Sequence, residues 1–211
     1  MRQIELVSFD AEGTLVTPDF SEAIWHEAIP GLYAQKKGLD LAQAKKCITD
    51  EYNKVGVHRL EWYDIEYWFS CLGLGSSEPV IRSCLNKIAH YPEVIEVLSS
   101  LAGEYPLIVA SGTPLKLLDY LLRDIKPYFV RIFSSISNYR QVKTPDFYYK
   151  LCEEMSVKPG QVIHVGDSWQ FDFVNARQAG MNALYVDRSG ANREDSLGDL
   201  TRLKDFLTAS A

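Results

Sequence analysis

Apolar residues occur along this chain in two different patterns, and the first predicts strands that alternate with helices. Short β-branched runs, each closed by small or acidic residues, predict strands at residues 4–9, 106–110, 162–165 and 182–186. Apolar positions at helical spacing predict helices at residues 93–101, 115–123, 147–155 and 171–179, with a short closing helix at 200–207. This alternation is typical of a parallel sheet built from βαβ units, which predicts the α/β fold class.

The second pattern fills residues 18–90, where the spacing is helical and no strand pattern is found. Two helices are predicted in "SEAIWHEAIPGLYAQKKG", ending at Gly38, and "DLAQAKKCITDEYNKVG", starting after Asp40, and two more in "LEWYDIEYWFSCLGLG" and "EPVIRSCLNKIAHY". We therefore expect a Rossmann-like parallel sheet core flanked by helices at residues 1–17 and 91–211, with an all-helical cap domain at 18–90 inserted after the first strand. Open α/β sheets bind ligands beyond the carboxyl ends of their strands, so we expect the insertion to act as a lid; the alternative is a purely structural insertion.

Composition and charge narrow the classes of partner. The 211 residues are 46% hydrophobic, enough for a buried core, and the net charge of −6 argues against binding to nucleic acid or to an anionic membrane. No apolar stretch has the length of a membrane span and the N-terminus leads directly into a strand pattern, so neither a membrane segment nor a signal peptide is expected. The four cysteines form no CxxC pair, which predicts reduced thiols in a cytoplasmic protein. We expect a monomer or a homodimer.

Polar side chains gather where the predicted strands end. They are carboxylates, hydroxyls and one lysine that precedes a predicted helix: Asp10, Glu12, Ser111, Thr113, Lys143, Asp167 and Asp172. Because the carboxyl ends of parallel strands meet at one edge of a sheet, we expect these side chains to share a crevice. Clustered carboxylates repel one another unless a cation lies among them, and oxygen ligands suit Mg²⁺. Taken singly, each residue has a simpler interpretation as a helix cap or a solvated lysine.

Four stretches carry a resemblance to a known family. In chain order they are "FDAEGTLV", "VASGT", "KTPDFYY" and "VIHVGDSWQFDFVNARQAGM". With them, nearly the whole chain resembles the haloacid-dehalogenase-like (HAD) hydrolase superfamily, in its subgroup with a helical cap after the first motif. The resemblance implies a Mg²⁺-dependent phosphomonoester hydrolase that acts on a small soluble metabolite through an aspartyl-phosphate intermediate.

The resemblance also implies a role for each motif residue. Asp10 would be the nucleophile, and a carboxylate suits this role because it is ionised at neutral pH and needs no activating base. Lys143 would tie the nucleophile to the phosphoryl group with a compact positive charge. The implied Mg²⁺ ligands are Asp10, the backbone carbonyl of Glu12, Asp167 and Asp172. The implied phosphate-binding residues are Ser111, Gly112 and Thr113.

Glu12 departs from the family pattern, because phosphatases of this superfamily usually carry Asp two residues after the nucleophile as general acid and base. The functional group is kept on an arm one methylene longer, so we expect Glu12 to perform this role from a different rotamer. The alternative is a slow enzyme in which Glu12 does not reach. Haloacid dehalogenases generally lack an acid here, and enolase-phosphatases share the "EGT" context but not a "GDSWQFD" motif. A 2-haloacid dehalogenase-type hydrolase using Asp10, or a non-catalytic HAD-like binding protein, stays as the alternative function.

The stretch "VGVHRLEWYDIEYWF" is the most suggestive part of the helical block. His58 and Arg59 stand beside aromatic residues and could bind an anionic or aromatic group of the substrate. The simpler interpretation is that the aromatic residues of this stretch pack the helices against one another, since aromatics at this density usually form a core.

Overall fold

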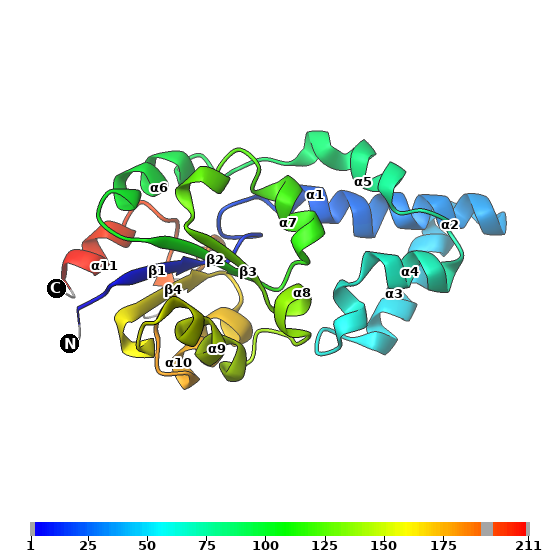
Figure 1. Cartoon of the computed structure of the whole chain (residues 1–211). Coiled ribbons are helices and arrows are strands. Elements are labelled where there is room, and N and C mark those ends of the chain that lie inside the picture. Colours follow the sequence, from blue (N-terminus) through cyan, green and yellow to red (C-terminus); the bar gives the residue numbers. More distant parts are fainter. Residues whose placement is uncertain (1–2, 191–195, 210–211) are drawn as a thin grey trace. The chain divides into compact units, whose positions relative to one another are not determined.

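The computed structural model describes residues 3–190 and 196–209 and divides the chain into two compact units (Figure 1). One unit consists of Met1–Val16 and His90–Ala211, and the other of Thr17–Ala89. We call them the α/β unit and the helical unit. None of the helices in the described ranges is long and apolar enough to cross a membrane.

A six-stranded parallel sheet forms the centre of the described part of the α/β unit. Its strands lie in the order β3-β2-β1-β4-β5-β6, so the first strand of the chain is central. Their bounds are β1 Leu6–Phe9, β2 Leu107–Ser111, β3 Arg131–Ser134, β4 Val162–Gly166, β5 Asn182–Val186 and β6 Ser196–Leu197. The four predicted strands and the parallel α/β fold are confirmed, whereas β3 and β6 were not predicted.

Helices cover both faces of this sheet. They are α6 Val94–Ala102, α7 Leu115–Leu121, α8 Ser135–Tyr139, α9 Pro145–Met155, α10 Asn175–Gln178 and α11 Leu203–Ala209. Short 3₁₀ turns lie at Lys126–Tyr128 and Pro159–Gln161. Figure 1 shows α9 and α10 on one face and α6 and α7 on the other. Because both faces are covered, the central strands are buried throughout their length, and they are mainly apolar rather than alternating.

The core under α9 and α10 joins strand and helix side chains into one apolar layer. It includes Leu6 and Ile108 from the sheet, Phe147 and Leu151 from α9, and Ala176 from α10, each at most 1% exposed. The helix predicted at residues 171–179 is only partly an α-helix, because Trp169–Val174 forms a π-helical segment that continues into α10. Such wide turns are frequent at functional sites, and this one contains a candidate site residue.

The helical unit contains the helices predicted for its sequence. They are α1 Asp19–Glu22, α2 Ile29–Lys37, α3 Leu41–Val55, α4 Ile65–Leu72 and α5 Glu78–Cys84, with a π-helical segment at Ala23–Ala28 and 3₁₀ turns at Leu60–Tyr63 and Leu85–Lys87. Gly38 ends α2 in the left-handed conformation, with φ 65°, which costs glycine little. The Asp40 side chain accepts the Gln43 amide at 2.8 Å and so caps α3.

Aromatic rings pack the interior of the helical unit. Tyr52 lies at the centre, with ring centroids 4.6 Å from Trp68, 5.9 Å from Trp25 and 6.1 Å from Trp62. The aromatic stretch singled out in the sequence therefore contributes, in part, to packing.

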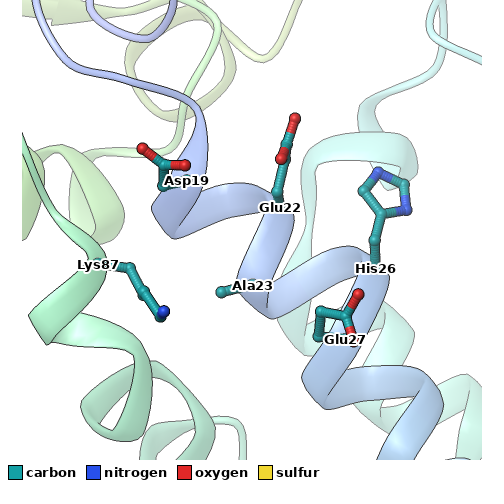
Figure 2. Close-up of a pocket in the computed structure, with 6 residues that line it drawn as sticks. All are labelled: Asp19, Glu22, Ala23, His26, Glu27 and Lys87. Atoms are coloured by element: carbon teal, nitrogen blue, oxygen red, sulfur yellow. The ribbon is translucent and has the colours of Figure 1, made fainter.

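A separate polar hollow of about 260 Å³ lies along α1, and its lining is Asp19, Glu22, Ala23, His26, Glu27 and Lys87 (Figure 2).

Candidate active site

Two carboxylates follow the two central strands directly. Asp10 comes after β1 and Asp167 after β4, and these strands are paired with Phe9 opposite Val165. The Asp10 amide donates to the Val165 carbonyl at 2.9 Å, which continues the pairing beyond β1. Asp172 completes the group from the π-helical segment. One carboxylate oxygen from each of Asp10, Asp167 and Asp172 lies within 4.8 Å of the other two.

A buried lysine neutralises part of this charge. The Nζ atom of Lys143 lies 2.9 Å from Asp10 Oδ1 and also donates to Asp172 Oδ1. The backbone is held in place as well, since the Asn175 side chain donates to the Lys143 carbonyl at 2.6 Å. Lysine is almost never buried without a counter-charge, so its side chain, 7% exposed, marks a specific environment. Three carboxylates face one ammonium, which leaves the group with an excess of negative charge.

The pKa values of the group reflect this balance. Burial raises the pKa of Asp10 above its usual value, and the ammonium of Lys143 opposes that rise. Burial also works to raise the pKa of Asp172, but Lys143 and His164 outweigh it and hold that pKa well below its usual range. Asp167 keeps a solvent-exposed edge, yet its carboxylate packs against Gly13, and burial together with the charge of Asp10 raises its pKa to about 7.

Two glycines allow the carboxylates to approach the backbone. A Cβ atom on Gly13 would overlap the Asp167 carboxylate, and one on Gly166 would overlap that of Asp172. Gly13 also has a positive φ of 77°, a conformation that side chains disfavour. These two positions therefore need glycine for reasons of space, and at Gly13 for conformation as well.

A buried polar chain behind Asp172 was not predicted from the sequence. His164, fully buried on β4, contacts Asp172 Oδ1 through Nε2 at 3.1 Å and Ser8 Oγ on β1 through Nδ1 at 2.9 Å. Because a carboxylate only accepts, we assign the proton to Nε2, and in the neutral ring Nδ1 then accepts the Ser8 hydroxyl. The Ser168 amide donates to Asp172 Oδ2 at 2.9 Å. Both oxygens of Asp172 therefore already accept from the protein.

The loop after β2 brings hydroxyl groups to the same edge. Ser111 ends β2 and is buried, and its Oγ accepts the Thr113 amide at 3.2 Å. The Thr113 hydroxyl donates to Glu12 Oε2 at 2.7 Å, so the structure joins Thr113 to the acid after β1. Gly112 lies between Ser111 and Thr113 in this loop.

Arg188, which was not predicted as a site residue, holds the loop that follows the first strand. Its guanidinium donates to the Thr14 carbonyl at 2.9 Å and pairs with Glu93 at 2.8 Å. It also lies over the ring of Tyr91, 3.4 Å from the centroid. A single arginine thus fixes the turn between Asp10 and the start of the helical unit.

The two candidate substrate residues of the helical unit, His58 and Arg59, are exposed. Arg59 Nη2 pairs with Glu61 Oε1 at 2.6 Å within the same unit. Their place in a substrate site stays a prediction.

The acidic group has the chemistry of a site for a hard divalent cation. Asp10 Oδ1 is a buried oxygen near Lys143 that receives no well-directed hydrogen bond. The donor set consists of carboxylate oxygens, which suit Mg²⁺ and similar ions. An added divalent cation would offset the remaining negative charge, so the residues fit such a group.

Fold and acidic site together define an α/β enzyme of the hydrolase class. The chain belongs to the haloacid dehalogenase-like hydrolase family, whose model matches residues 4–180. The chain is 25% identical over 201 residues to the glyceraldehyde 3-phosphate phosphatase of Pyrococcus furiosus, covering 88% of this chain and 81% of that protein.

Two further similarities differ in extent. A stretch of 73 residues, 35% of this chain, is 30% identical to the GMP/IMP nucleotidase YrfG of Escherichia coli, and the match spans only 32% of the nucleotidase's length. The crystal structure of a HAD phosphatase from Thermococcus onnurineus has a TM-score of 0.83 at 23% identity, over 97% of this chain and 98% of that one. The similarity to the Thermococcus onnurineus structure shows a shared fold.

Proposed function

We propose that the protein is a Mg²⁺-dependent phosphomonoester hydrolase that acts on a small soluble metabolite through an aspartyl-phosphate on Asp10. The observation that carries this proposal is the buried ion-pair group in which Lys143 contacts Asp10 and Asp172. A nucleophilic carboxylate must approach a negatively charged phosphate, and a fixed ammonium beside it lowers the electrostatic cost of that approach.

The proposed reaction has two steps on the chain's own residues. In the first, a carboxylate oxygen of Asp10 attacks phosphorus, the ester P–O bond breaks, and Glu12 gives a proton to the leaving alcohol. In the second, Glu12 takes a proton from water, the water oxygen attacks phosphorus, and the aspartyl-phosphate bond breaks to release phosphate. Ser111 and the Gly112 amide would bind phosphate oxygens.

The metal ligands in this proposal are Asp10, Asp167 and the backbone carbonyl of Glu12. Asp172 would bind the metal directly or through a water molecule. It would also support the site through its contact with Lys143. Bound Mg²⁺ supplies charge neutralisation for the phosphoryl group.

We further propose that the helical unit acts as a cap that selects the substrate, with His58 and Arg59 as candidates for contact with it. One relative is a nucleotidase and another is a glyceraldehyde 3-phosphate phosphatase. These two names direct the search for substrates toward phosphomonoesters of nucleosides and of small sugars.

The four cysteines are free, in agreement with a cytoplasmic enzyme. We propose that this enzyme is a monomer or a homodimer.

The test is phosphate release from a panel that contains GMP, IMP, glyceraldehyde 3-phosphate and p-nitrophenyl phosphate, with Mg²⁺ and with EDTA. Wild-type protein should release phosphate only with Mg²⁺, and Asp10→Asn should release none. Full activity of Asp10→Asn would refute the mechanism. Glu12→Gln should lower kcat by about a hundredfold, and unchanged turnover would exclude Glu12 from the mechanism.

A 2-haloacid assayed for halide release tests the alternative activity in the same experiment. Halide release without Mg²⁺, together with no phosphate release, would identify a dehalogenase instead. If neither product forms and calorimetry detects no Mg²⁺ binding, the protein is a non-catalytic member of the family.

A further inference from the structure

Glu12 stands where the family pattern has a shorter acid, and the structure shows what holds its longer arm. We propose that Thr113 is a positioning residue whose hydroxyl fixes the Glu12 carboxylate for the two proton transfers. The inference rests on the proposed function and deepens it. It also moves Thr113 from phosphate binding, the role that the family resemblance implies, to the support of the acid–base residue.

The backbone around Glu12 is fixed by a tight turn. The Gly13 amide donates to the Val16 carbonyl at 2.8 Å, and the Leu15 amide donates to the Ala11 carbonyl at 2.8 Å. Glu12 and Val16 also form an isolated β-bridge. With the Cα atom held in this way, the remaining freedom of Glu12 is in its side-chain torsions.

The backbone around Thr113 is fixed from the neighbouring strand. β1 and β2 are paired with Phe9 opposite Val109, so the loops that carry Glu12 and Thr113 leave the sheet side by side. The Thr113 amide donates to Ser111 Oγ, and Pro114 directly precedes α7. The hydroxyl of Thr113 is thus presented from a rigid support.

The bond between the two side chains then removes the extra freedom that a glutamate brings. Glu has one more rotatable bond than Asp, and leaving that torsion free would spread its carboxylate over several positions. The Thr113 hydroxyl donates to Glu12 Oε2 at 2.7 Å, a distance typical of a good O–H···O bond. Oε1 is the other oxygen of the same carboxylate, and holding Oε2 orients it for proton transfer. A residue that acts as acid and base needs such a defined position before its proton affinity matters.

The experiment measures kcat and KM of Thr113→Val and Thr113→Ser with p-nitrophenyl phosphate and Mg²⁺. Valine keeps the shape and removes the donor, so kcat should fall about tenfold with KM and the inhibition constant of inorganic phosphate unchanged. Serine keeps the donor and should restore most of the lost kcat. Thr201→Val is the matched control, since it removes another hydroxyl-to-carboxylate bond, from Thr201 to Asp199, outside the site. An unchanged kcat in Thr113→Val, or a raised KM and phosphate inhibition constant, would overturn the inference.

The double variant separates this inference from the proposed function. In a Glu12→Gln background, Thr113→Val should cost less than twofold in kcat, because the group that it positions is already disabled. If Glu12→Gln alone has full kcat, the proposed role of Glu12 fails. If Glu12→Gln loses activity but Thr113→Val does not, only the positioning role fails.

A crystal structure of Thr113→Val provides a readout that is independent of turnover. The Glu12 carboxylate should leave its position or occupy several rotamers, whereas the turn at Gly13 should be unchanged. A Glu12 side chain in the same single position would overturn the inference. If Thr113→Val does not fold, as judged by circular dichroism, Thr113→Ala replaces it in every arm.

Discussion

The two units place ion pairs in opposite environments. In the α/β unit, Lys143 and Asp10 pair at 2.9 Å with side chains 7% and 9% exposed. In the helical unit, Lys46 and Asp50 pair at 2.8 Å with side chains 78% and 54% exposed. The two contacts are nearly equal in length, so the difference between them lies in the surroundings. Burying charge is expensive even when it is paired, and a buried pair is therefore weak evidence for stability and better evidence for a chemical use.

The interiors of the two units also differ in polarity. Aromatic rings around Tyr52 fill the helical unit, whereas the sheet of the α/β unit contains a chain of polar contacts from Ser8 through His164 to Asp172. Polar contacts of this kind stabilise only when each member has a partner, so removing one member should be costly.

Lys143→Met should produce the largest loss of stability. It leaves the buried carboxylates of Asp10 and Asp172 without their counter-charge, which should lower the free energy of unfolding in urea by about 3–5 kcal/mol. Lys150→Met is the matched control, because Lys150 pairs with Asp146 on the surface of α9. Equal losses in the two variants would show that burial does not distinguish them.

His164→Leu should be the next most severe. Asp172 and Ser8 each lose a partner in a fully buried place, and the expected cost is about 2 kcal/mol in the free energy of unfolding. Ser8→Ala should cost less by itself and add little in the His164→Leu background, because both changes break the same contact. Fully additive losses in the double variant would contradict the polar chain.

Asp167→Asn should change the pH dependence of stability in EDTA. The pKa of Asp167 is about 7 in the folded protein against an ordinary 3.8, so the unfolded chain releases this proton first as pH rises between these values. Wild-type protein therefore loses stability across that window, and the asparagine variant does not share this loss. By calorimetry, Asp167→Asn should melt above wild type at pH 8, with a smaller advantage at pH 5.

The control for this pH effect is Asp146→Asn. The hydrogen bond from Lys150 lowers the pKa of Asp146, which is the opposite direction, so no gain at pH 8 is expected. Mg²⁺ should raise the melting temperature of wild type more than that of Asp167→Asn. An advantage of Asp167→Asn that is equal at pH 5 and pH 8 would show that its ionisation is not the cause.

The central strands could be predicted because helices on both faces make them mainly apolar. β3 was missed because it lies at an edge and begins with the exposed Arg131, and β6 because it has two residues. Sequence order and the βαβ pattern were enough to bring the strand-end acids to one edge. They were not enough to find Ser8 and His164, although each is a single polar residue inside an apolar strand.

The order of the strands in the sheet explains why Ser8 and His164 could not be recognised as partners from the sequence. Ser8 and His164 are direct partners in the register of β1 and β4, but these strands are far apart in the sequence. The contact between Thr113 and Glu12 depends in the same way on β1 lying next to β2. Arg188 gave no signal, because nothing near it in the sequence indicates that it holds a distant turn.

Asp50→Ala should have the smallest effect of the series, and it completes the comparison between the two units. The variant removes the partner of Lys46 on α3, but both side chains of the wild-type pair lie in water, so the Lys46 ammonium stays solvated without Asp50. The urea midpoint should therefore stay within experimental error of wild type, and added salt should not change the difference. Measured beside Lys143→Met, a loss of similar size would mean that the length of the contact decides its energy. A negligible loss would show that burial does, and that the ion pairs behind Asp10 are costly to disturb because water cannot replace them.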